Sequence, residues 1–154
     1  LLLSRRWCGI TNRKDTEYDV KELGWNYYMN EFSAAIGLEQ LKKLDKTNLM
    51  RKRNAKKYFE QIVLDKKMPY DKECSYHFYW IRVKNREKFR EKLLKRGIET
   101  GIHYKPIHKF SLYKSKIKLP ITEKISKEIV TLPTHPNLTQ KDLEKIIKTV
   151  NQLI

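Results

Sequence analysis

The four histidines are the side chains of this sequence best suited to chemistry near neutral pH. They are His77, His103, His108 and His135. His103 and His108 could share a metal ion, but Pro106 lies between them and the neighbouring sequence offers no carboxylate or thiol. We therefore predict no metal site. Hydrogen bonding in a pocket fits these histidines better, and simple packing fits His77, which lies in an aromatic run.

Self-contained catalytic motifs are absent from the sequence. It holds no GxGxxG, GxxxxGK[ST], GxSxG or HExxH pattern and no CxxC pair. Cys8 and Cys74 lie far apart, which favours two reduced thiols in a cytosolic protein. No apolar run approaches the ~20 residues that span a bilayer, so we expect no membrane segment.

The charge balance leaves two explanations open. The chain carries 34 Lys and Arg against 18 Asp and Glu, a net charge of +16. A field of this sign attracts polyanions, so one reading is a nucleic-acid-binding protein. The lysines are spread along the whole chain, which favours the other reading of solvated faces that carry lysine.

The spacing of apolar residues and the positions of turn residues predict the helices and strands that position these side chains. Residues 1–6 read as the middle of a helix, so we expect the chain to begin at a cut, with Gly9 ending this helix before a polar loop over 11–21. The aromatic stretch 24–29 is irregular and should be covered. Asn30 caps a long helix that runs to Ile62, with a buried start and a basic, solvated end.

The remainder predicts alternating strands and helices. The strands are expected at 76–83, 98–103 and 130–133. One helix between them is capped by Asn85, ended by Gly97 and buries Phe89, Leu93 and Leu94. A short helix with Ile125 and Ile129 begins at Thr122 or Glu123, and a capping box, Thr139 with Asp142, opens the last helix. The fold class is α/β (α+β), a small, mostly antiparallel sheet with helices on one side.

Two stretches resemble the DegT/DnrJ/EryC1/StrS sugar aminotransferases. The first is ELGWNYYMNE at 22–31, followed by AAIGLEQLKKLD at 34–45. The second is GIHYKPIH at 101–108, with LY at 112–113 and LPTHPNLT at 132–139. The two occur in the family's order and with similar spacing, so the resemblance covers nearly the whole chain.

The resemblance implies a fold-type-I enzyme that depends on pyridoxal 5'-phosphate (PLP). Such an enzyme is usually a homodimer in the cytoplasm, and it moves an amino group from glutamate to a keto group of a nucleotide-linked sugar. Residues 1–29 would end the large domain and residues 30–154 would form the small C-terminal domain.

The resemblance also assigns the cofactor-binding residues. Asn26 would reach the phosphate of the partner subunit's PLP, for which an amide donor is suited; a turn residue before a helix is its alternative role. Tyr28 stands where the family commonly has arginine, so one expected positive charge is missing.

Further family residues would contact substrate. His103, Tyr104, Lys105 and Pro106 would form a loop at the substrate mouth, with His108 close behind. A turn whose polar groups face water is the alternative. The catalytic lysine and the acidic partner of the pyridinium nitrogen would lie upstream, so no catalytic residue is expected in this chain, which alone should be inactive.

Two rival functions remain at this point. Some family members replace the lysine with histidine and dehydrate sugars, and only the upstream residue separates them from aminotransferases. The other rival is a basic nucleic-acid-binding or regulatory α/β module, suggested by the charge and the aromatic run 76–80. That run lacks the alternating glycine and aromatic residues of an RNA-recognition sheet, so nucleic acid is the less favoured partner.

Overall fold

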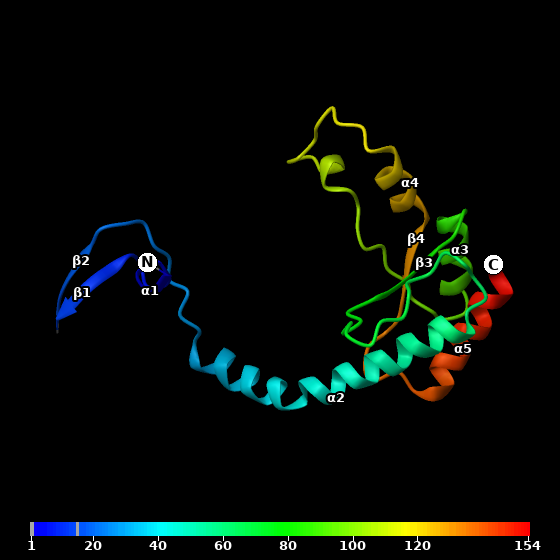
Figure 1. Cartoon of the computed structure of the whole chain (residues 1–154), viewed down its shortest axis with the longest axis horizontal. Helices are drawn as coiled ribbons and strands as arrows, with labels where there is room; N and C mark the ends of the chain where they lie inside the picture. The colour runs from blue at the N-terminus through cyan, green and yellow to red at the C-terminus, as the bar shows by residue number, and fades with distance from the viewer. Residues whose placement is uncertain (1, 15) are drawn as a thin grey trace. The chain divides into compact units, whose positions relative to one another are not determined.

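The computed structural model describes residues 2–14 and 16–154, which divide into two compact units. The first unit is Leu1–Leu44 and the second is Asp45–Ile154. The boundary expected between residues 29 and 30 stays a prediction. Figure 1 shows the elements of both units in chain order.

The first unit begins with helix α1 (Leu2–Arg6), as predicted, and continues as a β-hairpin. The polar loop expected over 11–21 is wrong, because β1 (Ile10–Lys14) pairs antiparallel with β2 (Glu17–Val20). Ile10 lies opposite Val20, and β-branched residues such as these favour paired strands. Gly9 turns the chain out of α1 with a φ of +76°, which glycine adopts without strain.

The aromatic stretch before the long helix is irregular, as expected, and lies on the surface of its unit. Asn26 forms an antiparallel bridge with Trp7, which ties the stretch to the end of α1. The exposed side chains of the stretch include Trp25, Tyr27 and Met29. Nothing within this unit covers them among the residues described, so the cover that their aromatic character predicts is not supplied by unit 1.

The long helix α2 (Glu31–Gln61) starts where the sequence predicts, because the Asn30 side-chain oxygen accepts a hydrogen bond from the Ser33 amide at 2.8 Å. The expected burial was wrong in direction. Phe32 and Ile36 are exposed, whereas Ala55 and Tyr58 are fully buried. The later residues pack against the second unit's sheet and last helix, and this packing overrides the basic composition around them.

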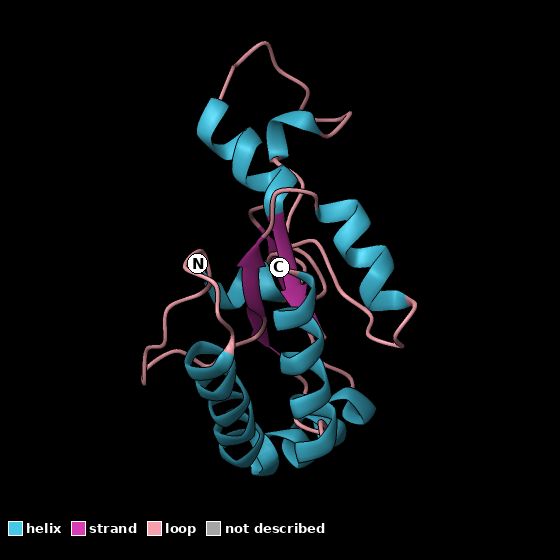
Figure 2. Cartoon of the chain, turned by 90° about the vertical axis from the view of Figure 1, so that its right-hand side faces the viewer, coloured by secondary structure: helices cyan, strands magenta, loops and turns pink. Residues whose placement is uncertain are grey.

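The second unit is built around a short antiparallel ladder, the magenta strands that run side by side in Figure 2. Strand β3 (Tyr79–Arg82) pairs with β4 (Ile129–Leu132), and Tyr79 lies opposite Leu132. Lys67 bridges β3 at Ile81 on the outer side of the ladder. Strand β3 is shorter than the 76–83 predicted, and β4 matches its prediction within one residue.

The strand expected at 98–103 reduces to one bridge, between Gly101 and Thr131. In the register of this bridge Glu99 would lie opposite Pro133, whose nitrogen has no hydrogen to donate to a ladder. On the outer edge of the segment, Arg90 donates from Nη2 to the carbonyl of Thr100 at 3.0 Å and from Nε to its hydroxyl at 3.1 Å.

Three further helices complete the second unit. Helix α3 (Arg86–Leu94) buries Phe89 and Leu93, but Leu94 is exposed, because it lies about 100° around the helix from Leu93. Helix α4 (Pro120–Glu128) begins two or three residues earlier than expected, with proline in its first turn, and Ile129 belongs to β4 instead.

Helix α5 (Gln140–Leu153) opens with the predicted capping box. A single apolar core joins the end of α2, the β3–β4 ladder, α3 and α5. Its largest fully buried side chains are Tyr58, Tyr76, Tyr79, Ile62, Ile81, Leu93, Val130 and Val150. The segment from 102 to 119 leaves this core and projects away from the ladder (Figure 1). The α/β class predicted from the sequence is confirmed by this arrangement.

Candidate functional site

His103 is held at the edge of a cleft by contacts on two sides. Its Nδ1 lies 2.8 Å from the hydroxyl of Thr131 in β4. Its ring stacks on Phe78, with centroids 5.4 Å apart and planes 8° from parallel. Because the hydroxyl and the stacked ring fix the imidazole, its Nε2 is the ring nitrogen left to meet a ligand.

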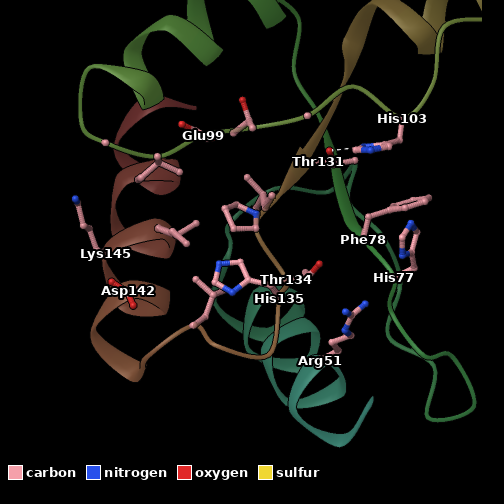
Figure 3. Close-up of a pocket in the computed structure, with 18 residues that line it drawn as sticks. Arg51, His77, Phe78, Glu99, His103, Thr131, Thr134, His135, Asp142 and Lys145 are labelled. Atoms are coloured by element: carbon pink, nitrogen blue, oxygen red, sulfur yellow. Dashed lines mark hydrogen bonds between the residues drawn. The ribbon is translucent and has the colours of Figure 1, made fainter. Parts of the chain in front are cut away.

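The cleft beside His103 has a volume of about 760 Å³ and lies entirely within the second unit. It is lined by the end of α2, the Gly97–Gly101 segment, the residues after β4 and the first turns of α5. Figure 3 shows the side chains that face it, with His103, Phe78 and His77 on one side and Asp142 and Lys145 on the other. A volume of this order suits a drug-sized or nucleotide-sized ligand.

Arg51 is more buried than Lys145, the lysine that lines the same cleft. Its side chain is half-buried, and its Nε is buried without a hydrogen-bond partner in the part of the chain that the structure describes. Figure 3 shows its guanidinium pointing away from α2 toward the side of the cleft on which His77 lies. Arginine remains charged at any physiological pH, so this group gives the cleft a permanent positive charge.

The other predicted substrate residues surround a second cavity. Tyr104, Lys105, Pro106 and His108 line a largely apolar space of about 860 Å³, whereas His103 lines the cleft described above. Tyr104 still contacts His103 edge to face, with centroids 4.7 Å apart. The structure therefore brings His103 and Tyr104 together and directs the remainder of the predicted loop to a neighbouring cavity.

His108 is engaged in a local ion-pair cluster. Its Nε2 lies 3.1 Å from Oε1 of Glu123 in α4, and Lys109 Nζ lies 3.2 Å from Oε2 of the same carboxylate. Hydrogen bonds from His108, from the Leu119 amide and from Lys109 lower the pKa of Glu123 to about 2. With only 10% of its side chain exposed, His108 holds this segment in place more than it faces a ligand.

Lys105 is arranged differently from His108. Its ammonium lies 5.3 Å from the centroid of the Phe110 ring. Lys105 is exposed, and this contact with the ring does not use its N–H donors as a hydrogen bond to an oxygen would. The three N–H donors of the ammonium are therefore within reach of an anion. Pro106 precedes a short 3₁₀ turn, η1 (Ile107–Lys109), and its carbonyl accepts the Lys109 amide at 2.9 Å.

Asn26 and Tyr28 lie together in the first unit. The Asn26 side-chain oxygen accepts a hydrogen bond from the Tyr28 amide at 3.3 Å. Its Nδ2 group is exposed and donates to no acceptor among residues 2–14 and 16–154. An exposed amide donor fixed by its own oxygen fits a phosphate, so this residue fits the phosphate-bearing cofactor that the family resemblance implies.

A cation lies against the ring of Tyr28, although this position holds tyrosine where the family commonly has arginine. The guanidinium carbon of Arg6 lies 4.9 Å from the ring centroid, and Trp7 contacts the same ring edge to face. The positive charge that Tyr28 does not supply is therefore present beside it, on α1.

Arg51, Phe78 and Thr131 are the site residues that sequence reasoning missed. Arg51 was placed on a solvated helix end, but it lies four residues before Ala55 and seven before Tyr58. This spacing puts Arg51 on the buried stripe of the helix, and it is the signal that could have identified the residue. Thr131 carried no sequence signal, because its role depends on His103 from another segment.

The sequence matches the model of the DegT/DnrJ/EryC1/StrS aminotransferase family over residues 3–151, so the chain belongs to this family. Among curated relatives, UDP-4-amino-4,6-dideoxy-N-acetyl-beta-L-altrosamine transaminase of Campylobacter jejuni is 30% identical over 95% of the chain and 42% of its own length. dTDP-3-amino-3,6-dideoxy-alpha-D-galactopyranose transaminase of Aneurinibacillus thermoaerophilus is 34% identical over 88% of the chain and 39% of its length.

Solved structures agree with the sequence comparison. Helicobacter pylori PseC, an aminotransferase involved in the biosynthesis of pseudoaminic acid, superposes with a TM-score of 0.87 at 29% identity, over 99% of this chain and 44% of that one. The sugar aminotransferase CalS13 of Micromonospora echinospora gives 0.88 at 27% identity, over 98% and 43%. The chain thus spans about two fifths of the length of the relatives it matches.

No helix among the described residues is long and apolar enough to cross a bilayer.

Proposed function

We propose that this chain is the C-terminal part of a PLP-dependent aminotransferase that transfers an amino group from glutamate to a keto group of a nucleotide-linked sugar. The setting we propose is the cytoplasmic synthesis of cell-surface polysaccharides or glycans. The support is the family match over residues 3–151 together with relatives named as transaminases of UDP- and dTDP-linked sugars. Residues 1–29 would close the large domain and 30–154 would form the small one.

The proposed role of this chain toward the cofactor rests on Asn26. PLP, when bound, supplies the electron sink of the reaction. Asn26 would donate a hydrogen bond from Nδ2 to the phosphate of the partner subunit's cofactor. The observation that supports this proposal is that Nδ2 is exposed and has no acceptor among the described residues. Arg6, beside Tyr28, adds a positive charge near the same place.

In this proposal the loop that begins at His103 contacts the substrate. His103 lines the cleft with Nε2 free of the Thr131 contact, and Tyr104 and Lys105 bring a hydroxyl and an ammonium to the neighbouring cavity. Pro106 sets the start of the 3₁₀ turn, and His108 anchors that turn to α4. These groups suit the hydroxyls and phosphates of a sugar nucleotide.

A homodimer is the proposed state, because Asn26 acts across a subunit boundary. The first turns of α2 and the stretch before it carry exposed apolar side chains: Trp25, Tyr27, Met29, Phe32, Ile36 and Leu41. Exposed apolar side chains gathered in one segment of this kind mark a protein contact. A partner subunit that receives Asn26 would cover part of it.

The test is an assay of the protein that carries this chain, with PLP, glutamate and 4-keto sugars linked to UDP or dTDP. We expect glutamate-dependent amination. In Asn26→Ala the affinity for PLP should fall about tenfold or more, because one hydrogen bond to a charged group is lost. Asn85→Ala is the matched control, since Asn85 is also exposed and caps α3 without a side-chain hydrogen bond. Dehydration of the sugar without amination would overturn the proposal.

A second measurement uses the 154-residue chain alone. We expect no lysine adduct with PLP that survives gel filtration before borohydride reduction, as read by mass spectrometry. A stoichiometric adduct at one lysine would show that the reactive lysine lies within this chain.

A further inference from the structure

The guanidinium of Arg51 has an N–H donor that no acceptor in its surroundings satisfies. Its Nε–H is buried away from water and has no acceptor in the described part of the chain, and no described carboxylate forms an ion pair with it. A buried donor without a partner costs free energy comparable to a lost hydrogen bond, and more when the group is charged. The Nη groups of the same guanidinium donate to no acceptor among the described residues either, and they are the atoms that an anion in the cleft can reach.

The acidic residues of the same cleft do not serve this purpose. Asp142 accepts hydrogen bonds from the amide and the hydroxyl of Thr139, at 3.0 and 2.6 Å, so its carboxylate closes the N-terminus of α5. Glu99 lies on the exposed Gly97–Gly101 segment, at the far side of the cleft from Arg51 in Figure 3. Neither carboxylate reaches the guanidinium.

Other polar side chains of the cleft can donate hydrogen bonds. His77 lies on the same side of the cleft as Arg51, and His103 lines the cleft beyond Phe78. Thr134, which is 6% exposed, adds a hydroxyl beside them. A guanidinium with nearby imidazoles and a hydroxyl is a donor set for an oxyanion, because two N–H groups of arginine match the spacing of two carboxylate or phosphate oxygens.

We propose that this cleft is an oxyanion-binding subsite in which Arg51 is the principal binding residue. The proposal rests on the proposed function, which offers two sources of the anion: a carboxylate of the amino donor and the diphosphate of the sugar nucleotide. Both present a pair of oxygens to the same donors. Arg51 would make the charge-assisted contacts, while His103, fixed by Thr131 and Phe78, would add a directed hydrogen bond.

The experiment is calorimetric titration of the 154-residue chain, without PLP, at a fixed ionic strength of about 0.15 M, where surface charges are largely screened. The probes are inorganic diphosphate and glutarate, titrated separately. The variants are Arg51→Gln and Arg51→Lys. Arg53→Gln is the matched control, because Arg53 lies on the same helix, is exposed and carries the same charge.

We expect at least one probe to bind, with an affinity that falls about tenfold or more in Arg51→Gln and less than twofold in Arg53→Gln. Arg51→Lys should recover only part of the loss, since an ammonium lacks the planar fork. The probe that depends on Arg51 identifies the source of the anion. Equal losses in the two glutamine variants, or no binding of either probe, would overturn the proposal.

The titration needs neither PLP nor catalysis, so its result stands apart from the amination assay. Circular dichroism of each variant before titration separates a lost site from a lost fold. A variant Arg51→Gln that is folded and binds both probes as the parent chain does would also sink the subsite.

Discussion

Arg51 and Tyr58 lie on one stripe of α2, and the environment of each decides what it does. Tyr58 is completely buried and donates from its hydroxyl to the carbonyl of Pro133 at 2.7 Å. Burial raises the pKa of Tyr58 far above its usual value, so the hydroxyl keeps its proton and remains a donor. Arg51 lies two turns earlier in the helix, and its side chain lines the cleft instead of packing in the core. The same stripe therefore anchors the helix at one end and offers a binding group at the other.

Removing the Tyr58 hydroxyl should destabilise the chain. In Tyr58→Phe the Pro133 carbonyl loses its donor, and we expect the free energy of unfolding to fall by about 1 to 2 kcal/mol. Urea denaturation measures the change. Tyr113→Phe, at an exposed tyrosine whose hydroxyl forms no hydrogen bond within the described residues, should change the free energy by less than about 0.5 kcal/mol. Equal effects in the two variants would contradict the role given to the Pro133 contact.

Gly101 leaves room for the pair formed by His103 and Thr131. A Cβ at this position would lie 2.7 Å from His103 Cε1 and 2.7 Å from the Thr131 hydroxyl oxygen. We expect Gly101→Ala to displace the imidazole and to lower the free energy of unfolding by about 1 to 3 kcal/mol, as overpacking does. The His103 ring resonances, followed by NMR, report the displacement.

The control for this substitution is Gly37→Ala. Gly37 lies within α2 with no atom within 4 Å of an added Cβ, so the change should raise helix content rather than disturb packing. His103 resonances that stay in place in Gly101→Ala would refute the steric argument.

At the scale of the elements, helices were predicted better than strands. The starts of α2 and α5 follow from Asn30 and from the Thr139–Asp142 box, because a cap and its helix lie within a few residues of each other. The hairpin over 10–20 was missed and the strand at 98–103 was overestimated. Pairing depends on what lies opposite, and for the latter segment the Gly101–Thr131 bridge brings Pro133, which has no amide hydrogen, opposite Glu99.

The segment between β3–β4 and α4 depends on one carboxylate. Glu123 holds His108 and Lys109 together, and loss of its charge should release the 107–119 segment. We expect Glu123→Gln to lower the urea midpoint at pH 7 and to speed proteolysis within the segment. Glu91→Gln, at an exposed glutamate on α3 that forms no ion pair within the described residues, is the matched control and should leave both unchanged.

The effect of Glu123 should depend on pH in a defined direction. Its pKa falls from 4.5 to about 2 in the folded chain, so its carboxylate stabilises the folded state above about pH 4.5 and progressively less as the pH falls toward 2. The difference in midpoint between the parent chain and Glu123→Gln should therefore be full at pH 7 and small at pH 2. A constant difference across this range would argue against an ionic role.

At the scale of the whole molecule, the positive charge suggests a nucleic-acid partner, whereas the exposed apolar side chains suggest a protein partner. The net charge of +16 is dispersed, and within the aromatic run 76–80 that suggested an RNA-binding sheet, Tyr76 and Tyr79 are fully buried. Apolar side chains gather instead at the start of α2. Contacts with protein are therefore favoured over contacts with nucleic acid.

Self-association should depend on the start of α2. We expect Ile36→Gln with Leu41→Gln to shift the chain toward monomer in analytical ultracentrifugation, because both side chains are about 65% exposed and glutamine preserves the helix. Ile117→Gln with Ile121→Gln removes equally exposed apolar groups at the far segment and should leave the distribution unchanged. A parent chain that stays monomeric at high concentration would contradict the proposed subunit contact.

Nucleic-acid binding, if present, should be weak and electrostatic. Any affinity for single-stranded RNA or DNA at low salt should fall steeply as salt rises toward about 0.15 M, as expected for counterion release without base stacking. Fluorescence anisotropy at several salt concentrations measures this. Tight binding that persists at physiological salt would restore the nucleic-acid rival.

The sequence by itself determined the family, the α/β class, the helix caps and the residues with chemistry to offer, because motifs, caps and periodicity are local. It did not determine which of these residues meet. His103 and His108 lie five positions apart but line different cavities, while Arg51 and His103, far apart in the chain, line one cleft. Only the tertiary structure could decide this, since burial, stacking and an unpaired guanidinium depend on segments that folding brings together.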